Sequence, residues 1–424
     1  MRLLYALILV ILLAGCGANT RGNGLLAQSD TIPSRESRWG QVITLADAEQ
    51  LDAPVLAVSS AGLIAVWVGV DAEADNDEGS VYLVERNISA QGITTSLPLP
   101  IPVAYPHDLQ FVPVTAGGGH LFWIDAIYNQ PEGDALLWMA RLNENAEMPR
   151  AHIRLADIRA ETFDVIADGD GGARVLWTGG SRGEPTLYLQ AIDVIGRPNF
   201  PQRLTTDARF PAFITLDDGL GAYWLRASDH LVIYGDLVND ELENITSAID
   251  SPLISPADRI VDFHALTDSV TTYLFWMIVR GDGSAETWFA HRPLSSENWS
   301  APERLGIGEM SDTRYETTFN GGSAFLTSRG ENWLQWSSPL SGNFDFVTLA
   351  GEIGDELVIM YLAEGSVIAV QPVVTLNHAL IGAPALVTDR DRHLYLTWSE
   401  PTLNGAAHQN FTSTKDFELT GANE

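Results

Sequence analysis

Gly62-Leu-Ile-Ala-Val-Trp67 decides the fold, because the chain repeats the form of this stretch along most of its length. A glycine or another turn residue is followed by alternating residues and, five positions on, by tryptophan. Further copies lie at Gly118–Trp123, Gly172–Trp177, Gly219–Trp224, Thr271–Trp276 and His393–Trp398. The tryptophans at 67, 123, 177, 224 and 276 are 47 to 56 residues apart. A period of this length indicates a repeat architecture.

A second strand signal follows each tryptophan strand, as in Val81–Arg86 and Leu136–Leu142, and turn clusters such as Asp168–Gly172 separate the signals. One period therefore holds about four short strands, which is one blade of a β-propeller. Weaker copies at Gly322–Leu326 and Glu356–Tyr361 bring the total to about eight. We predict an all-β propeller of about eight four-stranded antiparallel blades, with seven as the alternative.

The segment Gln41–Leu45 precedes the first copy and has no inner strand before it. We predict that it forms the outer strand of the last blade, which would close the ring and cover an open sheet edge. Residues 40–424 then form a single propeller domain, with two separate β domains as the alternative. The repeated tryptophans are expected to pack between adjacent sheets.

The N-terminus combines Arg2, an apolar run from Leu3 to Leu13 and the tetrapeptide Leu13-Ala-Gly-Cys16. A basic start before a short apolar run is typical of a signal peptide, and the run is shorter than the ~20 residues that a spanning helix needs. These residues resemble the lipobox of bacterial lipoproteins. The resemblance implies cleavage after residue 15 and a lipid on the sulfur of Cys16. An ordinary secretory signal with an incidental cysteine is the alternative.

Residues 16–39 are polar and rich in small residues, and we interpret them as a flexible tether between lipid and domain. Cys16 is the only cysteine, so an intrachain disulfide is excluded. The expected location is the cell envelope, outside the cytoplasm and attached to a membrane by lipid. The expected partners are that membrane and an envelope protein or a polysaccharide.

The charge balance is strongly acidic, with 55 Asp and Glu against 24 Lys and Arg and a formal net charge of −31. A negative surface of this kind repels phosphate backbones, so we expect no nucleic-acid partner. Solubility alone would also account for the charge.

Candidate site residues lie where the chain starts each innermost strand, near Pro54, Pro106, Pro211 and Pro384. Three arginines at similar positions in successive repeats could converge on a carboxylate through bidentate hydrogen bonds; they are Arg209, Arg259 and Arg314. Rim arginines that pair with acidic neighbours are the alternative. The other candidates for the channel mouth are Asp52, His107, Asp108, Tyr315 and Glu316.

The tryptophan strands, together with Trp-Ser-x-Pro at Trp299–Pro302, resemble secreted sialidase-like propellers. The resemblance implies three arginines on a sugar carboxylate and a Tyr/Glu nucleophile pair. However, the Asp-box of that superfamily is not intact, since Asp168-Gly-Asp-Gly171 lacks the leading Ser or Thr. Neighbours such as Tyr315 and Glu316 also point to opposite faces of a strand.

Metal and cofactor chemistry has little support in the sequence. Asp71–Glu78 is the densest acidic run, and Asp71, Asp75 and Asp77 form a weak candidate site for Ca²⁺. The run lacks the EF-hand glycine, and a solvated loop is the alternative. No histidine pair has zinc spacing, and the serine-hydrolase and phosphate-loop motifs are missing. We expect no other cofactor.

We therefore predict a lipid-anchored binding or scaffold module whose ligand is unknown, and we regard enzymatic activity as less favoured. One alternative is a sialidase-like glycoside hydrolase that acts on acidic sugars. Another is an envelope assembly factor that offers exposed strand edges.

Overall fold

The computed structural model describes residues 39–414 except 51–54, 60–61, 72–79, 90–91, 96–101, 105, 115–117, 127–133, 143–151, 181–182, 217–218, 268–269, 283–284, 306–312, 318–323, 329–331, 338–346, 354–355, 364, 378–383, 389–392 and 402–406. All the regular structure in these residues is β-strand, and every pairing between neighbouring strands is antiparallel. No helix in the described part of the chain is long and apolar enough to cross a membrane.

The N-terminal half forms sheets from strands that follow one another along the chain. The first sheet contains β2 (Val55–Ser59), β3 (Gly62–Asp71), β4 (Ser80–Ser89) and β5 (Gly92–Thr95), with β6 (Pro102–Val103) paired to β4. The next strands, in sheet order, are β7 (His107–Pro113), β8 (Gly119–Asp125), β9 (Leu136–Leu142), β10 (Ile153–Ala167), β11 (Ala173–Gly179), β12 (Thr186–Ile192) and β13 (Gln202–Thr206). The long strand β10 pairs with β9 through its first part and with β11 through its second.

The following sheets have the same order. One contains β14 (Ala208–Leu216), β15 (Gly219–Arg226), β16 (Leu231–Val238) and β17 (Glu241–Asp250). The next contains β18 (Arg259–Thr267), β19 (Thr271–Val279), β20 (Ala285–Pro293) and β21 (Glu303–Leu305). A 6-stranded sheet contains β22 (Thr313–Thr317), β23 (Ala324–Ser328), β24 (Asn332–Ser337), β25 (Val347–Ile353), β26 (Glu356–Ala363) and β27 (Ser366–Thr375).

The two ends of the described chain meet in one sheet. Strands β28 (Ala385–Thr388), β29 (Leu394–Pro401) and β30 (Ala407–Ser413) form successive antiparallel pairs, and β1 (Ile43–Gln50) lies beside β30. Their register runs from Ile43 opposite Phe411 to Ala48 opposite Ala407. The last residues of β1 also pair with β3, so this strand joins two sheets.

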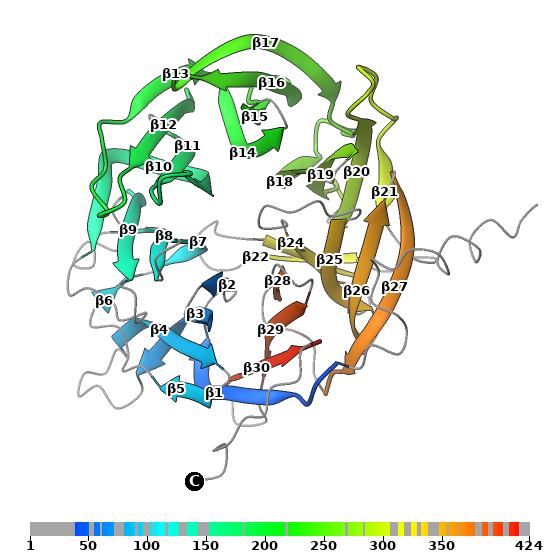
Figure 1. Ribbon diagram of the computed structural model, residues 1–424. Helices are drawn as coiled ribbons and strands as arrows, with labels where there is room; N and C mark the ends of the chain where they lie inside the picture. Colours follow the sequence, from blue (N-terminus) through cyan, green and yellow to red (C-terminus); the bar gives the residue numbers. More distant parts are fainter. Residues whose placement is uncertain are drawn as a thin grey trace, which may run out of the picture.

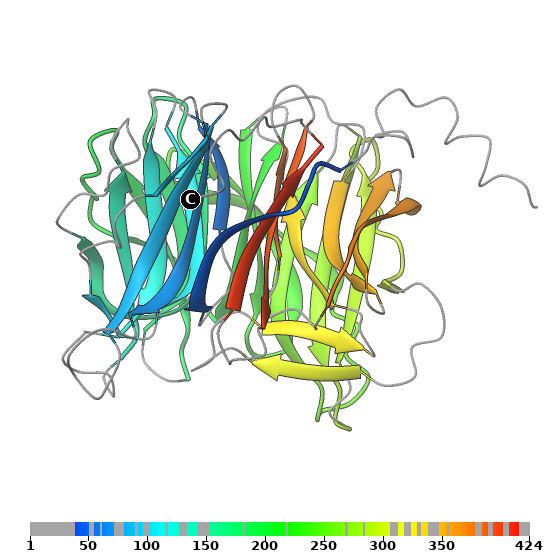
Figure 2. The ribbon, with the colours of Figure 1, turned by 90° about the horizontal axis from the view of Figure 1, so that it is seen from below.

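The sheets follow one another around a central axis (Figure 1). Strands β2, β7, β14, β18 and β28 lie nearest the axis, and β5, β13, β17 and β27 lie on the outside. Seen from the side, β22 and β23 lie across one end of the molecule, whereas most other strands run between its two ends (Figure 2). The chain therefore has an all-β, propeller-like fold.

The repeated tryptophans are the largest side chains of the core. Trp67, Trp123, Trp177, Trp276 and Trp398 are at most 1% exposed. Trp123, for example, packs with Ile64, Val66 and Leu83 of the preceding sheet. Each tryptophan buries a large apolar area between neighbouring sheets, which holds the sheets together around the axis.

Four of the strands nearest the axis, β7, β10, β14 and β18, contain a β-bulge, whereas β2 and β28 pair without a register shift. The register shifts between His107 and Gln110 in β7, Ala160 and Thr162 in β10, Arg209 and Ala212 in β14, and Ile260 and Asp262 in β18. Asp108 and Phe210 lie inside two of these bulges with φ of 55° and 50°. A bulge adds a residue to one strand and changes the direction of the side chains beside it. The bulges thus determine which side chains face the axis.

Candidate binding site at the propeller axis

Six innermost strands can be aligned through the repeated tryptophans. In each of them, one residue pairs with the residue that directly precedes the tryptophan in the following strand. In β7, β10 and β18 this residue is polar, and in β2, β14 and β28 it is apolar. The pairs are Gln110 with Phe122, Asp164 with Leu176, His264 with Phe275, Val55 with Val66, Ala212 with Tyr223, and Ala385 with Thr397. The polar residues therefore lie on three of the four successive innermost strands β7, β10, β14 and β18, with Ala212 of β14 as the exception.

Two of these polar residues hydrogen-bond to the next innermost strand along the chain. The Gln110 Nε2 donates to the carbonyl oxygen of Phe163 at 3.0 Å. The Asp164 Oδ2 accepts from the backbone N–H of Phe213 at 2.7 Å, and its Oδ1 accepts from the N–H of Val165 at 2.9 Å. Burial raises the pKa of Asp164, although the two N–H donors act in the opposite direction.

The third polar residue, His264, forms a pair with Asp262 on the same strand. Its Nε2 lies 3.2 Å from Asp262 Oδ2, while the N–H of Phe263 donates to Asp262 Oδ1 at 2.8 Å. Burial lowers the pKa of His264, but the carboxylates of Asp262, Asp164 and Asp108 outweigh burial and bring this pKa above its ordinary value. The charge of His264 is therefore favoured by carboxylates from β7, β10 and β18.

These four residues, Asp108, Asp164, Asp262 and His264, are called the axial cluster below. The side chains of His264 and Asp262 are 34% and 28% exposed, so water reaches them although burial is the largest influence on the pKa of His264. Carboxylates and an imidazole in such a place can bind hydroxyl or amino groups and can transfer protons.

The candidate residues predicted from the sequence are only partly brought together. Asp108 belongs to the axial cluster through its influence on His264. His107 is the first residue of β7, and Tyr315 and Glu316 are adjacent in β22, but the side chains of all three lie outside the described residues. Asp52 and Cys16 also lie outside the described residues.

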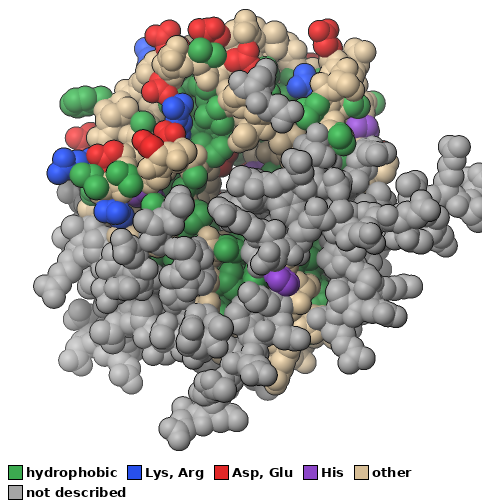
Figure 3. All heavy atoms as spheres, in the orientation of Figure 1, with side chains coloured by type: hydrophobic (Ala, Val, Ile, Leu, Met, Phe, Trp, Pro, Cys, Tyr) green, Lys and Arg blue, Asp and Glu red, His purple; other side chains and the backbone are tan. Residues whose placement is uncertain are grey.

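The proposed convergence of three arginines stays a prediction. Arg209 Nε lies 3.9 Å from Glu161 Oε2, and Arg159 Nη1 lies 3.2 Å from the other oxygen of Glu161. Arg259 is exposed at the start of β18, and the side chain of Arg314 lies outside the described residues. Acidic and basic side chains lie close together along the rim of the face shown in Figure 3. The pairing of Arg209 thus fits the alternative of rim ion pairs.

The candidate Ca²⁺ site also stays a prediction. Asp71 is the last residue of β3, and Asp75 and Asp77 lie outside the described residues. Among the residues that the structure describes, the axial cluster included, no group of three or more His, Cys, Asp or Glu side chains could hold a metal ion.

The sequence analysis missed Gln110, Asp164, Asp262 and His264. One signal was available, because Asp164 and His264 precede Trp177 and Trp276 by similar distances and interrupt runs of apolar residues. Their direction depends on the bulges, which the alternation of residues does not reveal.

Comparisons with known proteins extend the description of the fold. No protein family model matches the chain, and no curated protein matches its sequence. Among solved structures, the polysaccharide lyase Uly1 superposes with a TM-score of 0.54 at 8% identity, covering 89% of this chain and 99% of its own. A PL25 ulvanlyase, also a polysaccharide lyase, gives 0.52 at 9% identity and covers 87% of this chain and 95% of its own. This chain shares its fold with both proteins.

A sialidase from Trypanosoma rangeli is a looser match, with a TM-score of 0.40 at 10% identity. The match covers 86% of this chain and 55% of the sialidase. At identities this low, likeness concerns the path of the backbone, and the chemistry has to be argued from the site.

Proposed function

We propose that this protein is a lipid-anchored extracytoplasmic lipoprotein whose β-propeller binds a carbohydrate at its axis. The axial cluster carries the proposal. Carboxylates from β7, β10 and β18 act electrostatically on His264, water reaches His264 and Asp262, and such groups bind sugar hydroxyls well. The two polysaccharide lyases that share the fold support carbohydrate as the class of ligand.

The propeller in this proposal has seven blades. In support, β22 to β27 belong to one sheet, although the sequence contains separate signals near residues 325 and 361. The two parts of β10 serve two successive blades. Strand β1 would supply the outer strand of the last blade, and its pairing with β30 supports this closure of the ring.

Attachment to the membrane in this proposal depends on Cys16, with residues 1–15 removed and residues 16–39 serving as the tether. Acyl chains on the cysteine and its amino group provide stable anchoring. Replacing the cysteine in C16A should move the protein from the membrane fraction to the soluble envelope fraction. An unchanged membrane fraction would show that lipid on Cys16 is not the anchor.

Binding can be tested with the purified full-length protein in detergent and a set of neutral, amino and uronic oligosaccharides. We expect at least one of them to bind and the variants D262N and H264Q to weaken its affinity about tenfold. D229N is the matched control, because Asp229 forms an exposed pair with Arg226 at a distance of 2.8 Å and does not belong to the axial cluster. Absence of binding to every saccharide would overturn the proposal.

A glycoside hydrolase is the second candidate, and the pKa of Asp164 is the observation that favours it. A carboxyl group whose pKa is raised by burial can donate a proton to a leaving sugar oxygen, while a carboxylate that stays ionised stabilises positive charge. Release of a chromophore from aryl glycosides by the wild type, and its loss in D164N, would support this candidate. No turnover of any glycoside would exclude it.

A further inference from the structure

We propose that one end of the propeller docks on the membrane that holds the lipid anchor, through exposed apolar side chains at the tips of its turns. This inference rests on the proposed anchoring through Cys16 and adds a surface of the domain that contacts lipid. Its starting point is that these side chains and the first described residues of the chain lie at the same end of the molecule.

The turns at this end belong to three successive sheets. Neighbouring strands are antiparallel, so the turns after β10 and β12 lie at one end of their sheet, as do those after β14 and β16 and those after β18 and β20. A Cβ on Gly171, after β10, would lie 3.3 Å from the side chain of Val194, after β12. Arg174 Nη1 lies 2.9 Å from Asp240 Oδ1, after β16, which joins two sheets. These turns form one face, called the turn face below.

The described chain begins at the same end. The turn after β28 leads to Leu394, the first residue of β29. The N–H of Thr414 donates to the Leu394 oxygen at 2.9 Å, and the N–H of Gly40 donates to the Ser413 oxygen at 2.7 Å. In Figure 2 the start of β1 (dark blue) lies toward the end opposite β22 and β23. A flexible tether of the length of residues 16–39 spans roughly 25 Å, so lipid at its far end would keep the turn face close to the membrane.

Apolar side chains at the turn face are exposed. Val194 and Ile195 occupy the centre of the turn after β12 and are 42% and 50% exposed. The N–H of Gly196 closes this turn by donating to the Asp193 oxygen at 2.9 Å. The centres of turns favour Gly, Pro, Asn and Asp, so two β-branched apolar residues there are unusual. The other exposed large apolar residues in or next to the turns of this face are Phe200, Val238, Val270 and Leu294.

A lipid surface fits these features. Exposed apolar groups that gather on one face mark contacts with proteins or membranes, and the position of the tether favours the membrane. The net charge of −31 opposes attraction to an anionic surface, so apolar burial at the lipid boundary has to supply the binding. The tether raises the effective concentration of the face at the membrane, so a few side chains are sufficient. The innermost strands β14 and β18 start at the opposite end, which would face away from the lipid.

The experiment uses the full-length lipidated protein in phosphatidylcholine vesicles with one environment-sensitive fluorophore. Cys16 is the only native cysteine and carries the lipid, so I195C or I254C, introduced one at a time, supplies the free thiol for labelling. Ile254 is the matched control, because it is 80% exposed in the loop between β17 and β18, at the opposite end. We expect lipids with brominated acyl chains to quench the fluorophore about threefold more at I195C than at I254C. High salt should leave this difference unchanged, since the contact is apolar.

Two further variants test which side chains make the contact. V270D/L294D places carboxylates on the turn face and should remove most of the quenching at I195C. I254D places one at the opposite end and should leave that quenching unchanged. Circular dichroism checks that each variant folds.

The outcomes separate this inference from the proposed anchor. Equal quenching at the two positions, or no effect of V270D/L294D, would overturn membrane docking and leave the anchor intact. Quenching at I195C that appears only when several protein molecules share a vesicle would indicate that the face binds a second copy, which also overturns the inference. Failure of the wild type to float with vesicles would overturn the proposed anchor, and this inference with it.

Discussion

The sheet of β18–β21 and the sheet in which β1 joins β28, β29 and β30, called the terminal sheet below, bury their central strands with different residues. In β19 all nine residues from Thr271 to Val279 are buried, and most of them are large and apolar. Strand β29 has the same place in its own sheet and is equally buried, yet it contains Thr397, Ser399 and Glu400. The central strand of one sheet therefore has threonines as its only polar side chains apart from Tyr273 and Trp276, and that of the other contains a hydrogen-bonded network with a carboxylate.

The network of the terminal sheet is centred on Glu400. Its carboxylate accepts from Asn410 Nδ2 at 3.0 Å, from Trp398 Nε1 at 3.3 Å and from the N–H of Asn377 at 2.9 Å. Nearby, Ser399 Oγ donates to Gln409 Oε1 at 2.6 Å. The network extends to the N-terminal strand through Thr44 Oγ1, which donates to Asn410 Oδ1 at 3.2 Å.

The difference reflects how each strand finds its register. Short connections, 268–270 and 280–284, join β18 to β19 and β19 to β20, so apolar packing is sufficient there. Thr44 and Asn410 are 366 residues apart, and no turn aligns β1 with β30. Directional hydrogen bonds oppose a slip by one residue, which would move every side chain to the other face. We interpret the buried polar groups as the feature that selects the correct register between β1 and β30.

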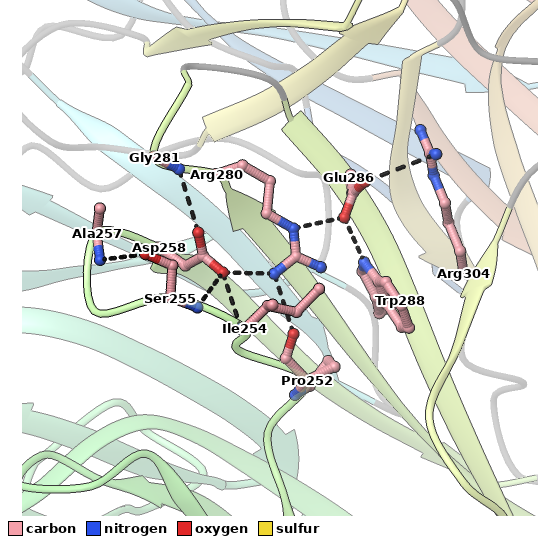
Figure 4. A network of polar contacts seen from close by, with 10 residues as sticks. All are labelled: Pro252, Ile254, Ser255, Ala257, Asp258, Arg280, Gly281, Glu286, Trp288 and Arg304. Atoms are coloured by element: carbon pink, nitrogen blue, oxygen red, sulfur yellow. Dashed lines mark hydrogen bonds and ion pairs between the residues drawn. The ribbon is translucent and has the colours of Figure 1, made fainter.

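A polar network at one end of the sheet of β18–β21 holds the loop that precedes β18 (Figure 4). Arg280 Nη1 donates to Asp258 Oδ2 at 2.7 Å and Arg280 Nε to Glu286 Oε2 at 2.6 Å. Burial would raise the pKa of Asp258, but the N–H groups of Ile254, Ser255 and Gly281 and the guanidinium outweigh burial and bring this pKa to about 2.

The largest expected effect is the loss of Arg280. The variant R280M would leave the buried carboxylate of Asp258 without its cation and Glu286 with Arg304 alone at 3.6 Å, and we expect a loss of about 3–5 kcal/mol in the free energy of unfolding. Urea denaturation measures it. The control R226M removes an exposed partner of Asp229 and should cost less than about 1 kcal/mol. Equal losses would show that burial of the ion pair does not matter.

The second largest effect is expected at the centre of the terminal sheet. N410A removes one donor from the buried carboxylate of Glu400, and we expect a loss of about 1–3 kcal/mol. N244A is the control, because Asn244 donates to Asp236 at an exposed site. The double variant E400L/N410L is compared with N410A. A regain of stability together with a less cooperative urea transition would support the interpretation that the buried polar groups select the register of this sheet. A change in N410A no larger than in N244A would contradict it.

A smaller effect is expected at the junction between the two ends of the chain. Thr412 Oγ1 donates to the carbonyl oxygen of Gly40 at 2.9 Å. T412V preserves shape and removes this bond, so we expect a loss of about 1 kcal/mol and faster hydrogen exchange at the N–H of Gly40, which donates to the Ser413 oxygen at 2.7 Å. Unchanged exchange would show that this side chain does not secure β1.

The smallest expected effect is a pH dependence with opposite signs at two histidines. Burial and the Arg141 guanidinium lower the pKa of His120 in the folded protein. The contribution of His120 to the free energy of unfolding is therefore complete above 6.5, the pKa of histidine in the unfolded chain, and declines as the pH falls below that value. The pKa of His264 is raised, so its contribution is complete below 6.5 and is lost as the pH rises through the folded value. Between pH 5 and 7.5 the stability of H120Q should therefore rise less with pH than that of the wild type, and that of H264Q should rise more. Identical slopes in all three proteins would refute both assignments.

The sequence predicted what depends on local pattern. Trp177 and Trp276 could be assigned to the layers between sheets because five-residue spacing and strand alternation are local properties. The signals near residues 325 and 361 could not be assigned to one sheet. The pairing between β22–β24 and β25–β27 depends on both segments, and neither sequence alone indicates it. Asp164 and His264 escaped notice because a bulge, rather than the alternation, directs their side chains toward the axis.

The pairing of β1 with β30 has a consequence for the order of folding. The first strand of the domain to be synthesised finds its partner in the last one, so this contact carries the greatest loop-closure cost in the molecule. Hairpins such as β19–β20 close within microseconds. We therefore expect the sheets to assemble from neighbouring hairpins first and β1 to dock last. Until it docks, β30 is an open edge to which a second chain could add a strand, so the slowest step in folding is also the one most exposed to aggregation.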